Sequence, residues 1–393
     1  MTNVPSSIVP PPLGRQPALD GIRGIAILSV LVFHFGWKWL PGGFLGVDVF
    51  FALSGFLITT LLLEDQLQFG VISLKRFFLR RAIRLYPALV ALVAVSTVFT
   101  LYFHRTTSLG RVFTIAEGVL LYDANWLTYA DSSGWFGGMP HTWSLAVEAQ
   151  FYLLWSVIIT VVSRHYAAAS ERKTMTRMLI LVASMIWVGS SAWRAILWSQ
   201  DAEWLRTYLG TDTRLDGVFL GSTAALLRLL WLQHPRRAWL MRVSRPTTAL
   251  VELASLGVLV FLFATLNFGQ SHCGLIGFTA AGAATSVLIL TSVLRPDSIL
   301  GPVFRLPMLT WIGRISYSIY IWHVPAEKLI RTESLLAHGF SPLAAEAMRV
   351  VVTLLLGAAS YYGIERTFLK LQNHFRPQGR DGSHSTILLN PTT

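Results

Sequence analysis

The strongest constraint on the fold of this 393-residue chain is a series of long apolar runs. Ten of them are long enough to cross a bilayer as helices of about 20 residues. They lie at about 22–40, 44–63, 86–103, 143–163, 178–198, 214–232, 248–267, 275–294, 312–331 and 347–367. Hydrophobic residues make up 53% of the chain and charged residues 13%, which leaves too few polar side chains to cover a soluble fold of this size. We therefore predict an all-α integral membrane protein, a bundle of about ten transmembrane helices.

The segment 104–142 contains an eleventh, weaker apolar run at 111–128, which is interrupted by Glu117, Asp123 and Asn125. With ten spans and both termini inside, the inner segments hold 22 of the 32 lysines and arginines. An eleventh crossing would invert every later loop and place many of those cations outside, against the positive-inside rule. We therefore predict a re-entrant or outer excursion near 104–142 and a multi-pass protein of the plasma membrane with both termini cytoplasmic.

The net charge of +12 does not indicate nucleic acid, because the cations fall mostly in short segments between apolar runs. In these segments we expect the cations to contact membrane lipids instead. The N-terminal stretch lacks a basic n-region and a cleavage site, so we expect the first run to be retained. A single cysteine, Cys273, excludes an internal disulfide and Cys-rich metal sites, and we predict no metal ion and no prosthetic group.

These boundaries divide the chain into three parts. Residues 1–20 are predicted to form a cytosolic N-terminal segment and residues 371–393 a cytosolic polar tail. The transmembrane domain between them, 21–370, carries all the candidate chemistry.

The first apolar run carries an arginine and a histidine on one helix face. His34 follows Arg23 by 11 residues, which on a helix places the two side chains within about 20° and about 16 Å apart along the axis. Ionisable groups inside a membrane are candidates for a functional site. The structural alternative is a snorkelling arginine and a histidine bonded to a neighbouring helix.

Two acidic side chains also lie within apolar runs. Asp48 could orient or charge-balance an imidazole, or it could cap a helix. Glu148 lies seven residues after His141, two turns along one helix face, and is a candidate for general base chemistry or for holding a histidine in its tautomer. Its alternative role is a hydrogen bond to a neighbouring helix. Ser54 and Gly55 indicate close helix packing.

A basic segment precedes the third run. Arg76, Arg80 and Arg84 recur every fourth residue, with Arg81 beside this stripe, and Pro87 follows where an interfacial helix is expected to turn into the span. Such a stripe is typical of a topology determinant that contacts anionic lipids. It also fits a cytosolic phosphate site, because arginine forks match phosphate oxygens.

His323 ends a segment that contains Tyr317, Tyr320 and Trp322. An aromatic belt at the membrane interface explains these rings without a function. His323 is therefore a weaker site candidate than His34.

Five blocks along the chain resemble one known family. They are LDGIRGIAILSVLVFHF, GVDVFFALSGFLIT, RRAIRLYP, HTWSLAVEAQFYLLW and GRISYSIYIWH. Together, and in this order, they resemble the acyltransferase-3 family of membrane O-acyltransferases over about 15–370. The resemblance implies transfer of an acyl group from cytosolic acyl-CoA to a sugar hydroxyl, usually on an extracytoplasmic glycan. Since only a short polar tail follows, we expect a stand-alone member without an SGNH domain.

The resemblance also assigns roles to individual residues. It implies that His34 is the essential first-helix histidine and Arg23 its nearby arginine. It matches Arg80, Arg81 and Arg84 to the motif associated with the phosphates of the donor. Glu148 matches the glutamate of the H-x-W-S-L-x-x-E pattern. One departure is Thr367, where many members have proline after Glu-Arg.

Residues and resemblance together give a mechanistic hypothesis. His34 acts as general base on the acceptor hydroxyl, with Asp48 or Glu148 holding its ring. CoA phosphates dock at Arg23 and the arginine motif. We assign His141, Trp143 and His323 to contacts with the sugar acceptor.

Other functions stay open at this point. The acyl group could be acetyl, succinyl or similar, and the acceptor an envelope polysaccharide, a lipid-linked sugar or an antibiotic sugar. A transporter or flippase would also place ionisable residues at mid-membrane. In a sensor or scaffold, the histidines would be structural.

Overall fold

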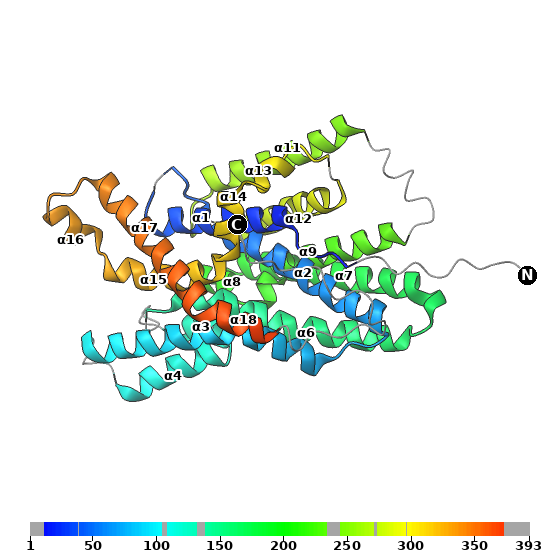
Figure 1. The fold of residues 1–393 in the computed structure, drawn as a ribbon, viewed down its shortest axis with the longest axis horizontal. Helices are drawn as coiled ribbons and strands as arrows, with labels where there is room; N and C mark the ends of the chain where they lie inside the picture. Colours follow the sequence, from blue (N-terminus) through cyan, green and yellow to red (C-terminus); the bar gives the residue numbers. More distant parts are fainter. Residues whose placement is uncertain are drawn as a thin grey trace, which may run out of the picture.

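The fold is a bundle of long helices, seen in a computed structural model that describes residues 12–37, 39–103, 108–131, 138–233, 244–270, 273–295 and 297–372. All regular secondary structure in these ranges is helical. The long helices run side by side along the long axis of the molecule (Figure 1). Within the described ranges, nine helices are long and apolar enough to cross a membrane. The predicted all-α membrane bundle is therefore confirmed.

Nine of the ten predicted runs coincide with these long helices. The helices are α1 (Pro17–His34), α2 (Gly46–Phe69), α3 (Leu74–Phe103), α6 (Trp143–His165), α7 (Arg172–Ser199), α9 (Thr211–Leu232), α11 (Arg245–Thr265), α12 (Phe278–Leu294) and α17 (Pro342–Ser360), which continues through η5 (Tyr361–Glu365) into α18 (Arg366–Gln372). The shorter elements are η1 (Gly43–Leu45), α4 (Leu109–Leu120), α5 (Ala124–Ala130), η2 (Pro140–Thr142), η3 (Ala169–Glu171), α8 (Trp204–Leu209), η4 (Cys273–Gly277), α13 (Gly301–Phe304), α14 (Pro307–Arg314), α15 (Ser316–Leu329) and α16 (Thr332–Ala337).

Helix α2 lies at the centre of the bundle. In its span 78% of the residues are buried inside the protein, against 22% for α7, which lies at the periphery. At Gly55 the backbone of α2 approaches the Val218 carbonyl of α9 so closely that any Cβ would clash. This confirms the close packing predicted at Ser54 and Gly55.

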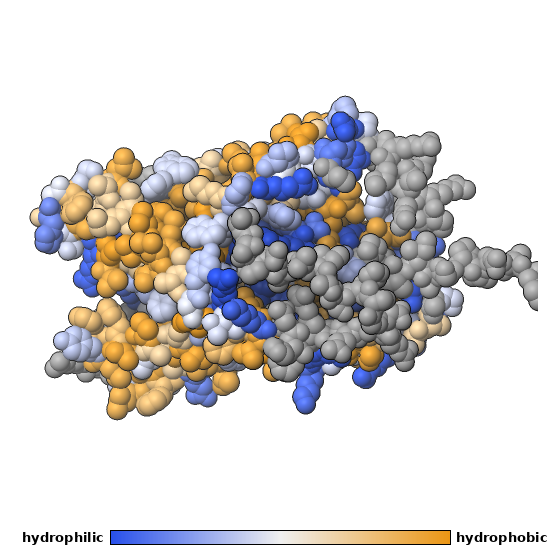
Figure 2. Space-filling model, in the orientation of Figure 1, coloured by the Kyte–Doolittle hydropathy of each residue, from blue (hydrophilic) through white to orange (hydrophobic). Residues whose placement is uncertain are grey.

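Apolar side chains cover much of the outer surface of the bundle. Figure 2 shows them gathered over α3, α4 and α17 on one face. Val98, Phe103, Phe113 and Leu355 are among the exposed ones. A contiguous apolar surface of this kind fits contact with lipid tails.

The tenth run, 312–331, is divided between α14 and α15. Helix α14 ends at Arg314, and α15 begins at Ser316. At Gly313 the backbone of α14 lies directly against the Asp20 carbonyl of α1, so a side chain there would clash. This contact places the start of α15 beside α1.

The excursion predicted near 104–142 forms a helical hairpin that enters the bundle. The Tyr86 hydroxyl of α3 donates to the Leu120 carbonyl at the end of α4, over 2.9 Å. Gln150 of α6 donates to the Tyr122 carbonyl at the tip, over 2.9 Å, and Asn125 donates to the Leu209 carbonyl, over 3.0 Å. The tip therefore packs against α3, α6 and α8 inside the bundle. Residues 104–107 and 132–137 of the predicted excursion lie outside the described ranges.

One predicted boundary is wrong. Pro87 does not separate an interfacial helix from the third span, because α3 is a single helix that continues through it. Proline is tolerated in membrane helices when neighbouring groups satisfy the freed carbonyl. The predicted N-terminal segment is described only from Pro12, and all of the predicted tail beyond Gln372 lies outside the described ranges.

Candidate active site

Three histidine side chains from distant parts of the sequence meet in the bundle. His34 ends α1, His141 lies in η2, and His323 lies in α15. The rings of His34 and His323 meet edge to face with centroids 4.6 Å apart, and those of His323 and His141 are 4.9 Å apart. The sequence singled out all three residues but did not predict that they form one cluster.

Backbone carbonyls fix the tautomer of each ring. His34 Nδ1 lies 2.9 Å from the Val30 carbonyl, His323 Nδ1 lies 2.5 Å from the carbonyl of Tyr320, and His141 Nε2 lies 3.0 Å from that of Ile321. A carbonyl oxygen only accepts, so each of these nitrogens carries the proton. The other nitrogen of each neutral ring then holds a lone pair, which on His34 is Nε2.

His34 is the most exposed member of the cluster. His141 and His323 are 4% and 0% exposed, whereas His34 is partly exposed. Within the described part of the chain, His141 Nδ1 and His323 Nε2 are buried without a hydrogen-bond partner. In the same residues no three His, Cys, Asp or Glu side chains are placed to hold a metal ion.

Tyr320 connects the cluster to the start of α6. Its hydroxyl donates to the His141 carbonyl over 2.8 Å and lies 2.7 Å from Ser144 Oγ. Because the Tyr320 proton goes to the carbonyl, Ser144 is the donor in the second bond. These bonds hold η2, and with it the His141 ring, against α15.

A second polar group surrounds Glu148, where α1, α2, α3 and α6 converge. Ser54 and Tyr152 each donate to a different carboxylate oxygen of Glu148 over 2.8 Å. Arg23 of α1 and Arg81 of α3 lie close enough to attract the carboxylate. The predicted alternative for Glu148, a bond to a neighbouring helix, is thus realised through Ser54.

The predicted arginine motif is divided between two places. Arg84 lies close enough to Arg23 and Arg81 to interact with both electrostatically, so these three cations gather near Glu148. Arg80 instead interacts with Asp65 of α2, as does Arg76. The helical stripe therefore does not present one continuous cationic face to a single site.

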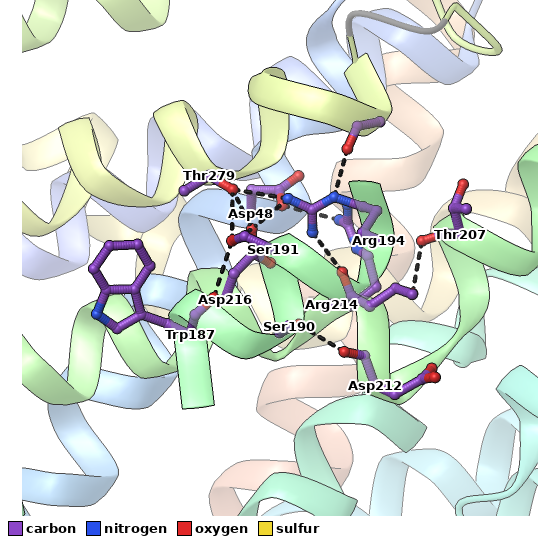
Figure 3. A network of polar contacts seen from close by, with 12 residues as sticks. Asp48, Trp187, Ser190, Ser191, Arg194, Thr207, Asp212, Arg214, Asp216 and Thr279 are labelled. Atoms are coloured by element: carbon purple, nitrogen blue, oxygen red, sulfur yellow. Dashed lines mark hydrogen bonds and ion pairs between the residues drawn. The ribbon is translucent and has the colours of Figure 1, made fainter. Parts of the chain in front are cut away.

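Asp48 belongs to a third polar group, the Arg–Asp network, which consists of Asp48, Arg194, Arg214 and Asp216 (Figure 3). Arg214 donates to Asp48 over 2.9 Å, and Arg194 donates to Asp216 over 2.8 Å. All four side chains are at most 1% exposed. Thr279 also donates to Asp216, over 2.6 Å, and thereby connects α12 to α9.

The contact predicted between His34 and an acidic side chain is not formed. Among the described residues, Asp48 pairs with Arg214 and Glu148 bonds to Ser54 and Tyr152. A carboxylate buried beside a guanidinium is held there by the cost of burying either charge alone. The ring of His34 is held by the Val30 carbonyl instead.

Trp143 does not face an open acceptor site. It is 6% exposed, and its ring packs on Tyr208 at 4.6 Å and Phe51 at 6.0 Å. The Arg214 guanidinium lies 5.6 Å from the same ring. Trp143 therefore forms part of the aromatic wall around the Arg–Asp network.

The sequence analysis missed Arg194, Arg214 and Asp216. The signal was present, because all three lie inside or at the edge of the predicted runs 178–198 and 214–232. Two arginines and two aspartates within membrane spans indicate pairing, since an unpaired charge is costly there.

Comparisons with known proteins agree with this architecture. Residues 16–363 match the family Acyl_transf_3, described as an acyltransferase domain. A putative O-acetyltransferase of Staphylococcus aureus strain MSSA476 is 32% identical over 360 residues, which cover 90% of this chain and 57% of that protein. The peptidoglycan O-acetyltransferase OatA of Listeria monocytogenes is 31% identical, over 79% of this chain and 49% of its own length.

A third relative, the O-acetyltransferase OatA of Staphylococcus aureus strain NCTC 8325, is 30% identical over 90% of this chain and 57% of its own. The chain thus spans about half the length of these relatives. No solved structure matches it. Since the family match covers nearly the whole chain, the protein belongs to the acyltransferase-3 family of multi-pass membrane proteins.

Proposed function

We propose that this chain transfers an acyl group from cytosolic acyl-CoA to a sugar hydroxyl of a cell-envelope glycan, with His34 as the general base. The observation that carries the proposal is the position of the proton on the His34 ring, together with the exposure of this residue. Its Nδ1 proton is bound to the Val30 carbonyl, and its ring is the partly exposed member of a buried histidine cluster. A neutral imidazole with a free lone pair is suited to accept a proton from a hydroxyl.

The donor end of the site is the group of cations near Glu148. Arg23, Arg81 and Arg84 gather near Glu148, and two further carboxylates, those of Asp20 and Glu365, act on Arg23 and Arg84. The three guanidinium groups suit the phosphates of CoA, because such groups bind phosphate oxygens through paired N–H donors. In this proposal Glu148 positions Arg23 and Arg81 rather than His34.

The reaction is a direct transfer. His34 Nε2 takes the proton of the acceptor hydroxyl, and the hydroxyl oxygen attacks the thioester carbonyl carbon. The new C–O bond forms as the C–S bond breaks, and the proton returns to the CoA thiolate, which leaves as CoASH. General base catalysis of this kind contributes about 10²- to 10⁴-fold in rate.

The orientation and the acceptor are part of the same proposal. We propose that both termini lie in the cytoplasm, which the positive-inside rule favours from the cation-rich segments. In this orientation Arg23 lies near the inner end of α1 and His34 near the outer end. Two of the relatives bear the name OatA, and one of these is named as a peptidoglycan O-acetyltransferase. We therefore propose acetyl as the acyl group and a peptidoglycan sugar as the acceptor.

The test uses the full chain in lipid nanodiscs with acetyl-, propionyl- and succinyl-CoA and a peptidoglycan oligosaccharide. Released thiol and the mass of the oligosaccharide are measured together. The proposal expects one donor to be consumed and the oligosaccharide to gain one acyl group per thiol. If no donor is consumed with acceptor present, while liposomes holding the protein move the intact oligosaccharide, the proposal is overturned in favour of a transporter.

A further inference from the structure

A lysine lies beside the histidine cluster at the outer end of α15. Lys328 is partly buried, and its Nζ lies 2.9 Å from the position that a Cβ on Gly138 would occupy. Gly138 has a φ of +77°, a conformation that glycine adopts without strain. The ammonium group can therefore pack directly against the backbone that leads into η2 and His141.

Lys328 differs from three nearby arginines because, within the described ranges, it forms no direct salt bridge. Arg111 pairs with Asp131 and Arg206 with Asp212, each at 2.6 Å. Arg349 pairs with Glu346 at 3.0 Å and with Glu327, the neighbour of Lys328, at 3.2 Å. Lys328 has no direct ion pair or hydrogen bond in the described ranges, and the carboxylate that attracts it, Glu327, is paired with Arg349. A partly buried ammonium in this position loses solvation and is compensated only in part.

The position of Lys328 relative to His34 follows from two chains of contacts. Lys328 lies close enough to His141 to interact with it electrostatically, and His141 leads through His323 to His34. On the other side, Arg349 lies 4.6 Å from the Phe35 ring, directly after His34. The last turn of α15 thus lies over the partly exposed end of α1.

We propose that Lys328 binds a carboxylate on the acceptor sugar and so selects acidic sugars as substrates. This inference rests on the proposed function, because it concerns the acceptor of the same reaction. In this proposal an acceptor that reaches His34 from the outer side passes the ammonium group, and its carboxylate forms the direct salt bridge that Glu327, paired with Arg349, does not form. A single lysine balances one negative charge, which matches a carboxylate better than a doubly charged phosphate. Lys328 is a specificity-determining residue in this account, since His34 performs the proton transfer.

The experiment compares two acceptors that differ in one charge. The probes are a tetrasaccharide of alternating N-acetylglucosamine and N-acetylmuramic acid, whose lactyl groups are carboxylates, and its methyl ester. Wild type is expected to have a kcat/KM about tenfold higher for the acid, the size of one charge-assisted hydrogen bond. In Lys328→Met, which keeps the apolar stem, kcat/KM for the acid is expected to fall to the value for the ester. The kcat/KM for the ester is expected to stay unchanged.

The matched control is Arg331→Met. Arg331 is exposed three residues further on, and its replacement removes the same net charge, so the preference for the acid is expected to remain. Equal kcat/KM for acid and ester in wild type, or an unchanged preference in Lys328→Met, overturns the inference and assigns Lys328 to lipid phosphates. A failure of the proposed function looks different, because wild type then acylates neither probe.

Discussion

The histidine cluster and the Arg–Asp network are both buried groups of ionisable side chains, yet they are built in opposite ways. In the network each carboxylate faces a guanidinium, and the four side chains join α2, α7 and α9. In the cluster the three rings are held by backbone carbonyls and not by opposite charges. The network therefore pairs its opposite charges, although among the described residues Asp48 Oδ2, Asp216 Oδ1 and two Arg214 nitrogens lack a hydrogen-bond partner. The cluster contains no opposite charge, and its basic nitrogens His141 Nδ1 and His323 Nε2 have no partner in the same part of the chain.

We propose that this difference separates a structural role of the network from a catalytic role of the cluster. Burial and charge alone do not distinguish them, because both groups combine the two. A catalytic group also needs a reactive atom that has no partner inside the protein and that a substrate can reach. His34 Nε2 is the candidate for this atom, because His34 is partly exposed. The comparison can be tested by changing one group at a time and measuring turnover and stability separately.

The largest effect is expected at His34. His34→Ala removes the proposed base, so kcat should fall about 10²- to 10⁴-fold. The apparent unfolding temperature should change little, because His34 is partly exposed and its hydrogen bond to the Val30 carbonyl is local. Wild-type turnover in a folded His34→Ala protein would move the catalytic role elsewhere.

The next largest effect is expected in the network, on stability. Arg214→Met leaves Asp48 buried without its partner, which should cost about 3–5 kcal/mol of unfolding free energy. Turnover per folded molecule should change little, since among the described residues no hydrogen bond or ion pair joins the network to the histidine cluster. Thermal unfolding in detergent, followed by activity of the folded fraction, measures both.

A double variant sharpens this prediction. Asp48→Leu combined with Arg214→Met removes both charges, and it should be more stable than either single variant because no uncompensated charge remains. Additive losses in the double variant would show that the two side chains do not act as a pair.

An intermediate effect is expected for the donor. Arg81→Lys keeps the charge but loses the planar fork, so KM for acyl-CoA should rise about tenfold with little change in kcat. Arg76→Lys on the same helix is the matched control, because Arg76 interacts with Asp65 and not with Glu148. Equal KM changes in the two variants would exclude a dedicated phosphate site at Arg81.

A smaller effect is expected at Tyr320. Tyr320→Phe removes the hydroxyl that joins the His141 carbonyl to Ser144, a loss of about 1 kcal/mol for a neutral hydrogen bond. Turnover should fall by a few-fold, since His141 supports His323 and through it His34. The result that would contradict this account is a loss as large as that of His34→Ala, which would make Tyr320 a reacting group.

The smallest effect is expected at an exposed counterpart of the network. Hydrogen bonds from Arg295 and Arg245 lower the pKa of Asp297 to about 2, below its ordinary value of about 3.9. Asp297 therefore stabilises the fold above about pH 4, and this stabilisation disappears as the pH falls toward 2. Asp297→Asn should slightly lower the unfolding temperature at pH 7, with a difference that shrinks below pH 4 and turnover unchanged. A constant difference across this range would contradict the assignment.

Much of the fold was predictable because lipid imposes a simple rule on the sequence. Helices that cross a bilayer need long apolar runs, and nine of the predicted runs coincide with spanning helices. The division of 312–331 was not predictable, because it depends on the contact of Gly313 with the Asp20 backbone, far away in sequence. The continuity of α3 through Pro87 depends in the same way on neighbouring helices.

The candidate site was predictable in its members but not in its pairings. His34, His141 and His323 were visible as histidines in or beside apolar runs, yet only the packing of α1, η2 and α15 brings them together. Asp48 or Glu148 was predicted to hold the His34 ring, but the partner of Asp48 is Arg214, 166 residues away in the chain. Pairings of this kind depend on how each helix is rotated about its own axis. A run that is apolar on all sides does not reveal this rotation.

The most direct test of the central claim is chemical rescue of His34→Ala with imidazole. The truncated side chain leaves room at a partly exposed position, so a free imidazole can take the place of the missing base. The account predicts that acyl transfer rises with imidazole concentration in His34→Ala and follows the fraction of unprotonated imidazole as pH is varied, while Arg81→Lys shows no such rise. Wild-type turnover in His34→Ala without imidazole would contradict the assignment of His34 as the base.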